Sequence, residues 1–90
     1  MFGTLTGSLM DALTNQGVPG ATVVGIGTGR STVTNPDGQF TISLLQPGQI
    51  TFEFSKPGYK TTSRTFTILN GSNGPVTVRI CPDVPFCVSQ

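Results

Sequence analysis

Cys81 and Cys87 are the only cysteines of this 90-residue chain, and the segment between them contains two prolines. Their spacing is not that of a CxxC pair, and the sequence has no histidine, so four zinc ligands are not available nearby. A disulfide is the favoured interpretation, because closing so short a loop would stabilise the fold by about 2 kcal/mol in the chain-entropy view. An intrachain disulfide, an interchain disulfide and two free thiols all remain open, since pairing also depends on the redox compartment.

Side chains with catalytic or metal-binding chemistry are dispersed along the chain. Asp37 and Asn35 offer oxygens to a calcium ion, but only one carboxylate is present there, so turn capping is the favoured interpretation. Asp11, Glu53 and Asp83 are well separated, and paired-carboxylate catalysis needs two such groups in one cleft. Without histidine, no usual pair of nucleophile and base can be assembled. We therefore predict no enzymatic activity, no cofactor and no metal site.

Turns that contain proline and glycine separate the segments that would position any site. In the most specific of them, proline sets φ at the second position, asparagine caps the backbone and glycine accepts a positive φ. The predicted structural turn residues are Asn35, Pro36, Asp37, Gly38, Pro47, Gly48, Pro57 and Gly58. The glycine run at 25–29 lacks GxGxxG spacing and a following helix, so it is interpreted as a flexible hairpin loop rather than a phosphate loop.

Alternation of apolar and polar residues predicts β-strands. It is clearest in the segments 40–44, 50–55, 65–68 and 76–80. Residues 2–9 alternate less clearly, residues 21–26 are apolar on both faces as in a central strand, and residues 30–34 are short and polar, which predicts an edge strand. No segment carries a helical stripe longer than one turn, so about seven strands in a sandwich or barrel are expected.

Composition excludes several classes of function. Charged residues make up 10% of the chain, against about 25% in an average domain, and the net charge is +1. No basic cluster is present for nucleic acid, and no apolar run approaches the roughly 20 residues of a membrane span. The first residues do not resemble a signal peptide. We expect an extracellular or virion location reached without classical secretion, while an excised domain and a cytoplasmic location remain open.

Five segments occur in an order that is similar to a known family. They read GSLMD at 7–11, GVPGATV at 17–23, TVTNPDGQF at 32–40, LQPGQITF at 45–52 and KPGYK at 56–60. Together they resemble the carboxypeptidase regulatory-like domain family over roughly residues 4–80. The resemblance implies an all-β fold, a seven-stranded antiparallel Greek-key β-sandwich of the transthyretin (prealbumin) type. It also implies a non-catalytic accessory module, attached to peptidases, surface proteins or outer-membrane receptors.

The expected organisation is one sandwich, residues 1–80, followed by an extended tail of residues 81–90 that contains cysteine and proline and lies outside the family core. The polar faces of the strands are rich in Thr and Ser and poor in charge, which favours packing against other subunits. The residues that show this are Thr61, Thr62, Ser63, Thr65, Thr67 and Thr77.

We therefore predict a structural or interaction protein that assembles on, or builds, a larger extracellular particle, such as a virion decoration or a surface filament. Its partners would be protein subunits of the same or a larger assembly, with no nucleic acid and no membrane insertion. Residues 2–9 and the tail are expected to contact neighbours, through edge pairing or a disulfide. Two alternatives remain. One is a module that binds carbohydrate or a surface polymer through loops around Gly27, Asn35 and Tyr59, and the other is an accessory domain of a secreted enzyme.

Overall fold

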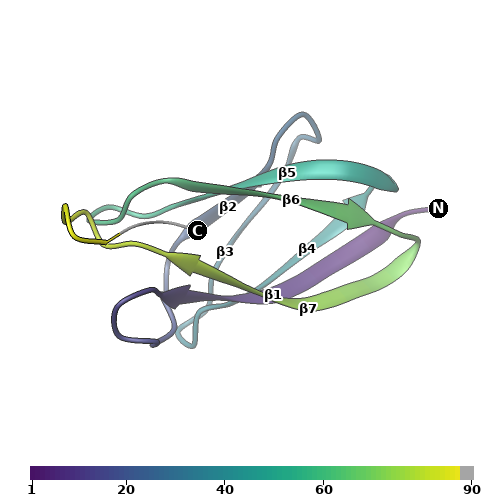
Figure 1. Ribbon diagram of the computed structural model, residues 1–90. Helices are drawn as coiled ribbons and strands as arrows, with labels where there is room; N and C mark the ends of the chain where they lie inside the picture. The colour runs from purple at the N-terminus through teal and green to yellow at the C-terminus, as the bar shows by residue number, and fades with distance from the viewer. Residues whose placement is uncertain (88–90) are drawn as a thin grey trace.

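The computed structural model describes residues 1–87, and these form seven β-strands in two sheets that pack face to face (Figure 1). The three-stranded sheet consists, in spatial order, of β4 (Gln39–Leu45), β1 (Gly3–Asp11) and β7 (Gly71–Ile80). The four-stranded sheet consists of β3 (Arg30–Val33), β2 (Thr22–Gly25), β5 (Gly48–Ser55) and β6 (Thr62–Ile68). Residues 1–87 contain no helix, and the predicted all-β architecture of two packed sheets is confirmed.

Alternating side chains build the core between the sheets. In β5, Phe52 and Phe54 are fully buried, whereas Glu53 between them lies on the outer face. Phe54 meets Phe40 of the opposite sheet edge-to-face, with ring centroids 5.6 Å apart, so the aromatic pair joins the two layers. Each such buried side chain contributes about 1.5–3 kcal/mol. The other buried apolar residues of the strands are Leu5, Leu9, Val23, Ile42, Leu45, Ile50, Ile68, Val78 and Ile80.

The first strand, β1, lies in the middle of its sheet. It pairs antiparallel with β4 and parallel with β7. The prediction of a purely antiparallel sandwich is therefore wrong for the β1–β7 pair. These are the first and last strands, joined through the rest of the fold rather than by a hairpin, so no tight turn imposes an antiparallel pairing. Because both edges of β1 are occupied, edge pairing by residues 2–9, which we had expected, is also wrong.

The four-stranded sheet agrees with the positions expected of its first two strands. β2 lies between β3 and β5, as its apolar residues predicted, and β3 lies at the edge.

Gly7 in β1 marks a close approach between β1 and β7 in the three-stranded sheet. A Cβ atom added to Gly7 would lie 2.5 Å from the backbone oxygen of Val76 and 2.8 Å from Cζ of Phe40. Only glycine lets β7 and the core pack this closely at the centre of the sheet.

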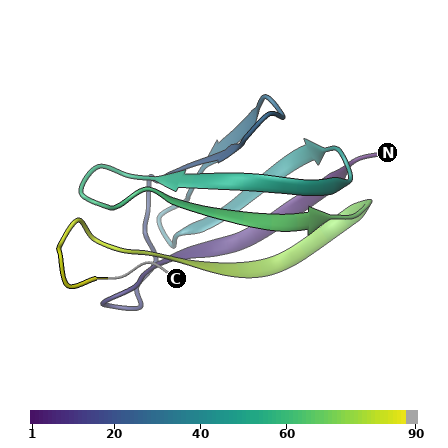
Figure 2. The same ribbon diagram turned by 45° about the horizontal axis from the view of Figure 1, so that its top comes forward.

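Most connections lie at the two ends of the sandwich, and the turn between β2 and β3 projects apart from the others (Figures 1 and 2). We call one end the turn end; it comprises residues 1–2, 26–29, 46–47 and 69–70. We call the other the loop end; it comprises residues 12–21, 34–38, 56–61 and 81–87. No helix among residues 1–87 is long and apolar enough to cross a membrane.

Candidate functional site

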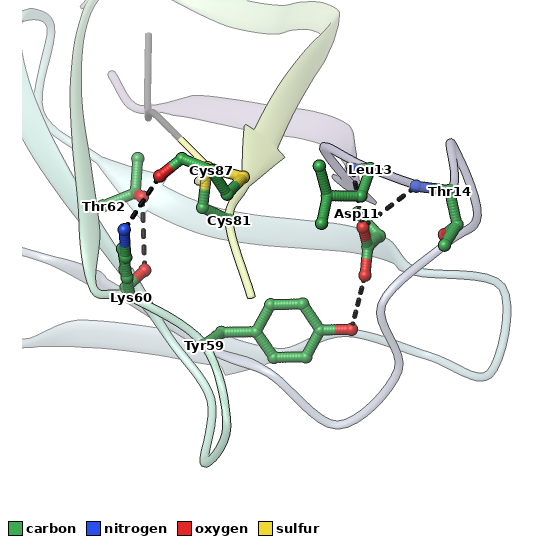
Figure 3. Close-up of a disulfide and its surroundings, with 8 residues drawn as sticks. All are labelled: Asp11, Leu13, Thr14, Tyr59, Lys60, Thr62, Cys81 and Cys87. Atoms are coloured by element: carbon green, nitrogen blue, oxygen red, sulfur yellow. Dashed lines mark hydrogen bonds between the residues drawn. A yellow bond between two sulfur atoms is a disulfide. The ribbon is translucent and has the colours of Figure 1, made fainter. Parts of the chain in front are cut away.

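The two cysteines lie at the loop end and are joined within the chain (Figure 3). Both are buried, and their Cα atoms lie 5.7 Å apart. The loop that they close is held against the β5–β6 loop by three hydrogen bonds. The Lys60 N–H donates to the Cys81 carbonyl at 2.8 Å, the Lys60 ammonium to the Cys87 carbonyl at 2.8 Å, and the Asp83 N–H to the Gly58 carbonyl at 2.9 Å. Of the states left open by the sequence, the structure shows the intrachain disulfide.

Asp11 occupies a buried position beside this loop, at the end of β1 (Figure 3). Its carboxylate accepts hydrogen bonds from the backbone N–H groups of Leu13 at 2.8 Å and Thr14 at 3.1 Å, and from the Tyr59 hydroxyl at 2.9 Å. Burial would raise the pKa of Asp11, but the hydrogen bonds from Leu13, Tyr59 and Thr14 favour the charged form, and together they lower the pKa below its ordinary value. The pKa of Tyr59 is raised by burial and by its hydrogen bond to the Asp11 carboxylate.

This cluster is suited to a structural role. Asp11 already accepts bonds at both carboxylate oxygens, and Tyr59 thereby ties the end of β1 to the β5–β6 loop. Among residues 1–87, no group of three or more His, Cys, Asp or Glu side chains is placed to hold a metal ion. The cluster of Asp11 and Tyr59 therefore fixes the loop end of the sandwich. The sequence did not predict this cluster, because a single aspartate at a strand end has no distinctive spacing.

The turn at 35–38 uses its own polar atoms. The side-chain oxygen of Asn35 accepts from the N–H groups of Asp37 and Gln39, both at 2.9 Å, and Gly38 has a φ of 81°. The amide oxygen that a calcium ion would need is thus already bonded to the backbone of the turn. Gly48 and Gly58, in two further proline-containing turns, also have positive φ values, 133° and 89°.

A groove of about 420 Å³ opens at the turn end, between the β2–β3 turn and the β4–β5 turn. Its rim carries Ile26 and Leu44, which are 52% and 49% exposed. The remaining lining residues are Gly27, Thr28, Gln46, Pro47, Gly48, Gln49 and Ile50. None of these side chains is charged, so the groove suits an uncharged ligand or an apolar side chain of a partner.

Leu44 reaches this rim through a β-bulge. Gly3 pairs with Leu45 and Leu5 pairs with Ile42, so β4 carries one more residue than β1 between these pairs. Leu44 takes a φ of 58°, a left-handed conformation that costs a residue with a Cβ atom about 1–2 kcal/mol. The alternation over 40–44 predicted an inward Leu44, and that prediction is wrong because the bulge sends Leu45 into the core instead.

The loops proposed for a carbohydrate site are not brought together. Gly27 lines the groove at the turn end. Asn35 lines a smaller groove of about 270 Å³ between β3 and β4, whereas Tyr59 is bonded to Asp11 at the loop end. Any single ligand would therefore meet only one of the three residues.

The free edges of the sheets are poorly suited to pairing with another strand. β7 carries Pro75, which has no N–H to donate, and β4 is interrupted by the bulge at Leu44. In β6, Arg64 lies on the same face of the strand as buried Thr62, and a charge on the inward face of an edge strand hinders pairing with another chain. β3 has only four residues, so it offers few backbone groups to a further strand. Contacts with a neighbouring molecule would then use faces or ends rather than edges.

The outer faces of both sheets are almost without charge. Among the described strand residues, the outer face of the four-stranded sheet carries one charged side chain, Glu53, and the outer face of the three-stranded sheet carries one, Arg79. Thr51 and Thr65 lie side by side on the first of these faces, with their hydroxyl oxygens 2.8 Å apart. The other Thr and Ser residues of the outer faces are Thr4, Thr6, Ser8, Thr22, Ser31, Thr41, Ser43, Ser55, Ser63, Thr67, Ser72 and Thr77.

Solved structures with the same fold come from bacterial proteins. A chain of a type II cohesin–X-dockerin complex from Acetivibrio cellulolyticus, a C-terminal interface mutant, aligns with a TM-score of 0.71 at 21% identity over 86% of this chain and 56% of that chain. The N-terminal interface mutant of the same complex gives 0.74 at 20% identity, over 88% and 57%. A candidate carbohydrate-binding protein from Bacteroides uniformis ATCC 8492 gives 0.67 at 16% identity, over 89% and 41%.

These likenesses establish the fold, and the chain spans little more than half the length of the first two matched chains. No curated protein sequence shows significant similarity. The model of the carboxypeptidase regulatory-like domain matches residues 4–80, nearly the whole sandwich and the range that the sequence motifs indicated. The chain therefore belongs to the carboxypeptidase regulatory-like domain family.

Proposed function

We propose that this chain is a non-catalytic module that binds other proteins as a subunit of a larger extracellular assembly. The observation that carries the proposal is the near absence of charge from both outer sheet faces among the described residues. Isolated domains commonly surround themselves with charged side chains, whereas a neutral face can be buried against a partner without desolvating ions. Membership in the carboxypeptidase regulatory-like domain family adds support, because the resemblance to that family implies a non-catalytic accessory module.

The finer form of the proposal is a decoration protein of a virion or a subunit of a surface filament. Such a protein needs close packing of many subunits, and the protected edges leave the neutral faces and the two ends for this packing. We also propose that the strand connections follow the Greek-key, transthyretin-like pattern. In this view residues 1–80 are the packing unit. The expected extended tail is wrong for residues 81–87, which form a disulfide-closed loop bonded to the β5–β6 loop of the same molecule, and residues 88–90 lie outside the described part of the chain.

The proposal is tested by isolating the protein from its native source under mild conditions and measuring the mass of the species that contains it. We expect a stoichiometric complex much larger than the 9.4 kDa chain, with the same partner subunits in independent preparations. A protein recovered only as free monomer, with no stoichiometric companion after chemical cross-linking, would contradict the proposal.

Carbohydrate binding is a second candidate, favoured by the groove at the turn end. Gln46, Gln49 and Thr28 offer uncharged hydrogen-bonding groups beside the apolar rim formed by Ile26 and Leu44. This combination suits a neutral ligand rich in hydroxyl groups. A glycan array decides between the candidates: binding that is lost in Gln49→Ala would favour carbohydrate, and no binding to any glycan would remove this alternative.

The chain also fits an accessory domain of a larger secreted enzyme, because it spans only part of the matched chains. The coding sequence around it tests this alternative directly. An in-frame catalytic domain would support it, and a neighbourhood of structural genes would favour assembly.

A further inference from the structure

The turn end carries most of the large apolar side chains that the described residues expose. They are Met1, Phe2, Ile26 and Leu69, together with Leu44 in the adjoining bulge near the end of β4. Strand pairing places Phe2 and Leu69 close together. Phe2 precedes the Gly3–Leu45 pair and its carbonyl accepts from the N–H of Gly71, while Leu69 follows the Gly48–Ile68 pair. Leu69 is 64% exposed, so this end presents several large apolar side chains to water.

Charge is distributed in the opposite way. The loop end and the strand ends beside it hold Asp11, Asp37, Lys56, Lys60, Arg79 and Asp83. Toward the turn end, the charged side chains of the described residues are Arg30, which directly follows the turn at 26–29, and Arg64, which lies in the same register row of the sheet. Packing the turn end of one molecule on the loop end of another would bury these charges against apolar groups, which is costly. Head-to-tail contact is therefore disfavoured.

We propose that the turn end is the contact surface for a second copy of this chain, which docks turn end to turn end about a two-fold axis. The inference rests on the proposed function and names one partner for it. A two-fold contact requires a surface that is complementary to itself. The turn end meets this requirement because it has both protruding apolar groups, Phe2 and Leu69, and an uncharged groove between Ile26 and Leu44 that can receive them. A net charge of +1 leaves little repulsion between copies.

The conformation of Leu44 is an independent reason to expect a partner at this surface. Gly or Asn would take the φ of 58° with less strain, yet a leucine stands there with half of its side chain in water. Backbone strain of this kind concentrates where a side chain has a function. In the dimer, the exposed half of Leu44 becomes buried.

The experiment is sedimentation velocity of the purified 90-residue chain, from about 10 µM to about 1 mM, a range that reports micromolar to millimolar affinities. We expect the mass to double with concentration. Leu69→Lys and Ile26→Lys each place two new charges, one per copy, into the contact and should raise the dimer Kd at least about tenfold. Phe86→Lys and Leu13→Lys are matched controls, because both residues are exposed and apolar but lie at the loop end. They should change Kd by less than about twofold.

Circular dichroism of each variant checks that it is folded, and the two turn-end variants serve as replacements for each other if one is not. A wild-type chain that stays monomeric at every concentration would overturn the inference, as would equal weakening by Phe86→Lys. A monomer that nevertheless forms a stoichiometric complex with a different protein would refute the second copy but leave the proposed function intact. A monomer without any companion would refute both.

Discussion

The strain assigned to Leu44 can be measured by comparing Leu44→Gly with Leu44→Ala. Both variants lose the same half-buried side chain, which costs each about 1 kcal/mol relative to wild type. Alanine keeps a Cβ atom at a φ of 58° and so keeps the cost of about 1–2 kcal/mol, whereas glycine removes it. Glycine in turn loses about 0.5–1 kcal/mol through the greater freedom of its unfolded chain. We therefore expect Leu44→Gly to be more stable than Leu44→Ala by about 0.5–1 kcal/mol.

Thr41 supplies the matched control. It lies on the same strand, faces outward between buried Phe40 and Ile42, and does not have a positive φ. In this ordinary strand position, Thr41→Gly should be less stable than Thr41→Ala by about 0.5–1 kcal/mol. Subtracting the two comparisons cancels the entropic term, so the difference between them, about 1–2 kcal/mol, measures the strain itself.

Urea unfolding followed by far-ultraviolet circular dichroism gives these free energies, because the all-β domain is small enough for a two-state analysis. In parallel thermal scans, each 1 kcal/mol of difference in stability should separate the thermal midpoints of two variants by about 4–8 °C for a chain of this length. If glycine is the less stable replacement at both positions, Leu44 is not strained, and the reason to expect a partner at its side chain disappears.

Three further predictions concern the loop end and the sheet centre. The pKa of Asp11 is lower in the folded than in the unfolded chain, so the charged carboxylate contributes stability above about pH 4, and this contribution is lost as the pH falls through the folded pKa. Asp11→Asn should therefore reduce the free energy of unfolding at pH 7 and flatten its dependence on acid pH, as measured by urea titrations. Replacing both Cys81 and Cys87 by Ser should lower the free energy of unfolding by about 2 kcal/mol, and reductant should have the same effect on the wild type but none on the variant. Gly7→Ala should destabilise by about 1–3 kcal/mol in thermal unfolding, because its Cβ would overlap the Val76 backbone and the Phe40 ring.

The sequence predicted those parts of the fold that depend on local pattern. Alternation in β5 identified Phe52 and Phe54 as core and Glu53 as surface, and the polar segment at 30–34 indicated an edge strand. The pairing partner of β1 could not be predicted from the sequence, because the parallel pairing of β1 with β7 is decided by how the two sheets close around the core. No residue within either strand signals that choice.

The candidate site was predicted less well, for a related reason. Leu44 looked like one more inward residue of an alternating strand, and only its pairing with β1 shows the bulge that turns it outward. The apolar surface at the turn end is likewise assembled from segments far apart in the chain, of which Phe2 and Leu69 are examples. Single exposed apolar residues are ordinary, so each one was uninformative until the fold placed them together.

The choice of residues at the turn end is not forced by composition or by turn geometry. Thr and Ser make up most of the outer sheet faces, and a polar residue at Leu69 or Ile26 would serve the tight turns as well. The chain instead concentrates apolar side chains there and protects its strand edges. A two-fold contact through the turn end would leave both neutral faces and the disulfide-closed loop end free for other subunits. A two-fold contact closes at a dimer, so growth into a larger particle would need a second kind of contact, for which these free surfaces leave room.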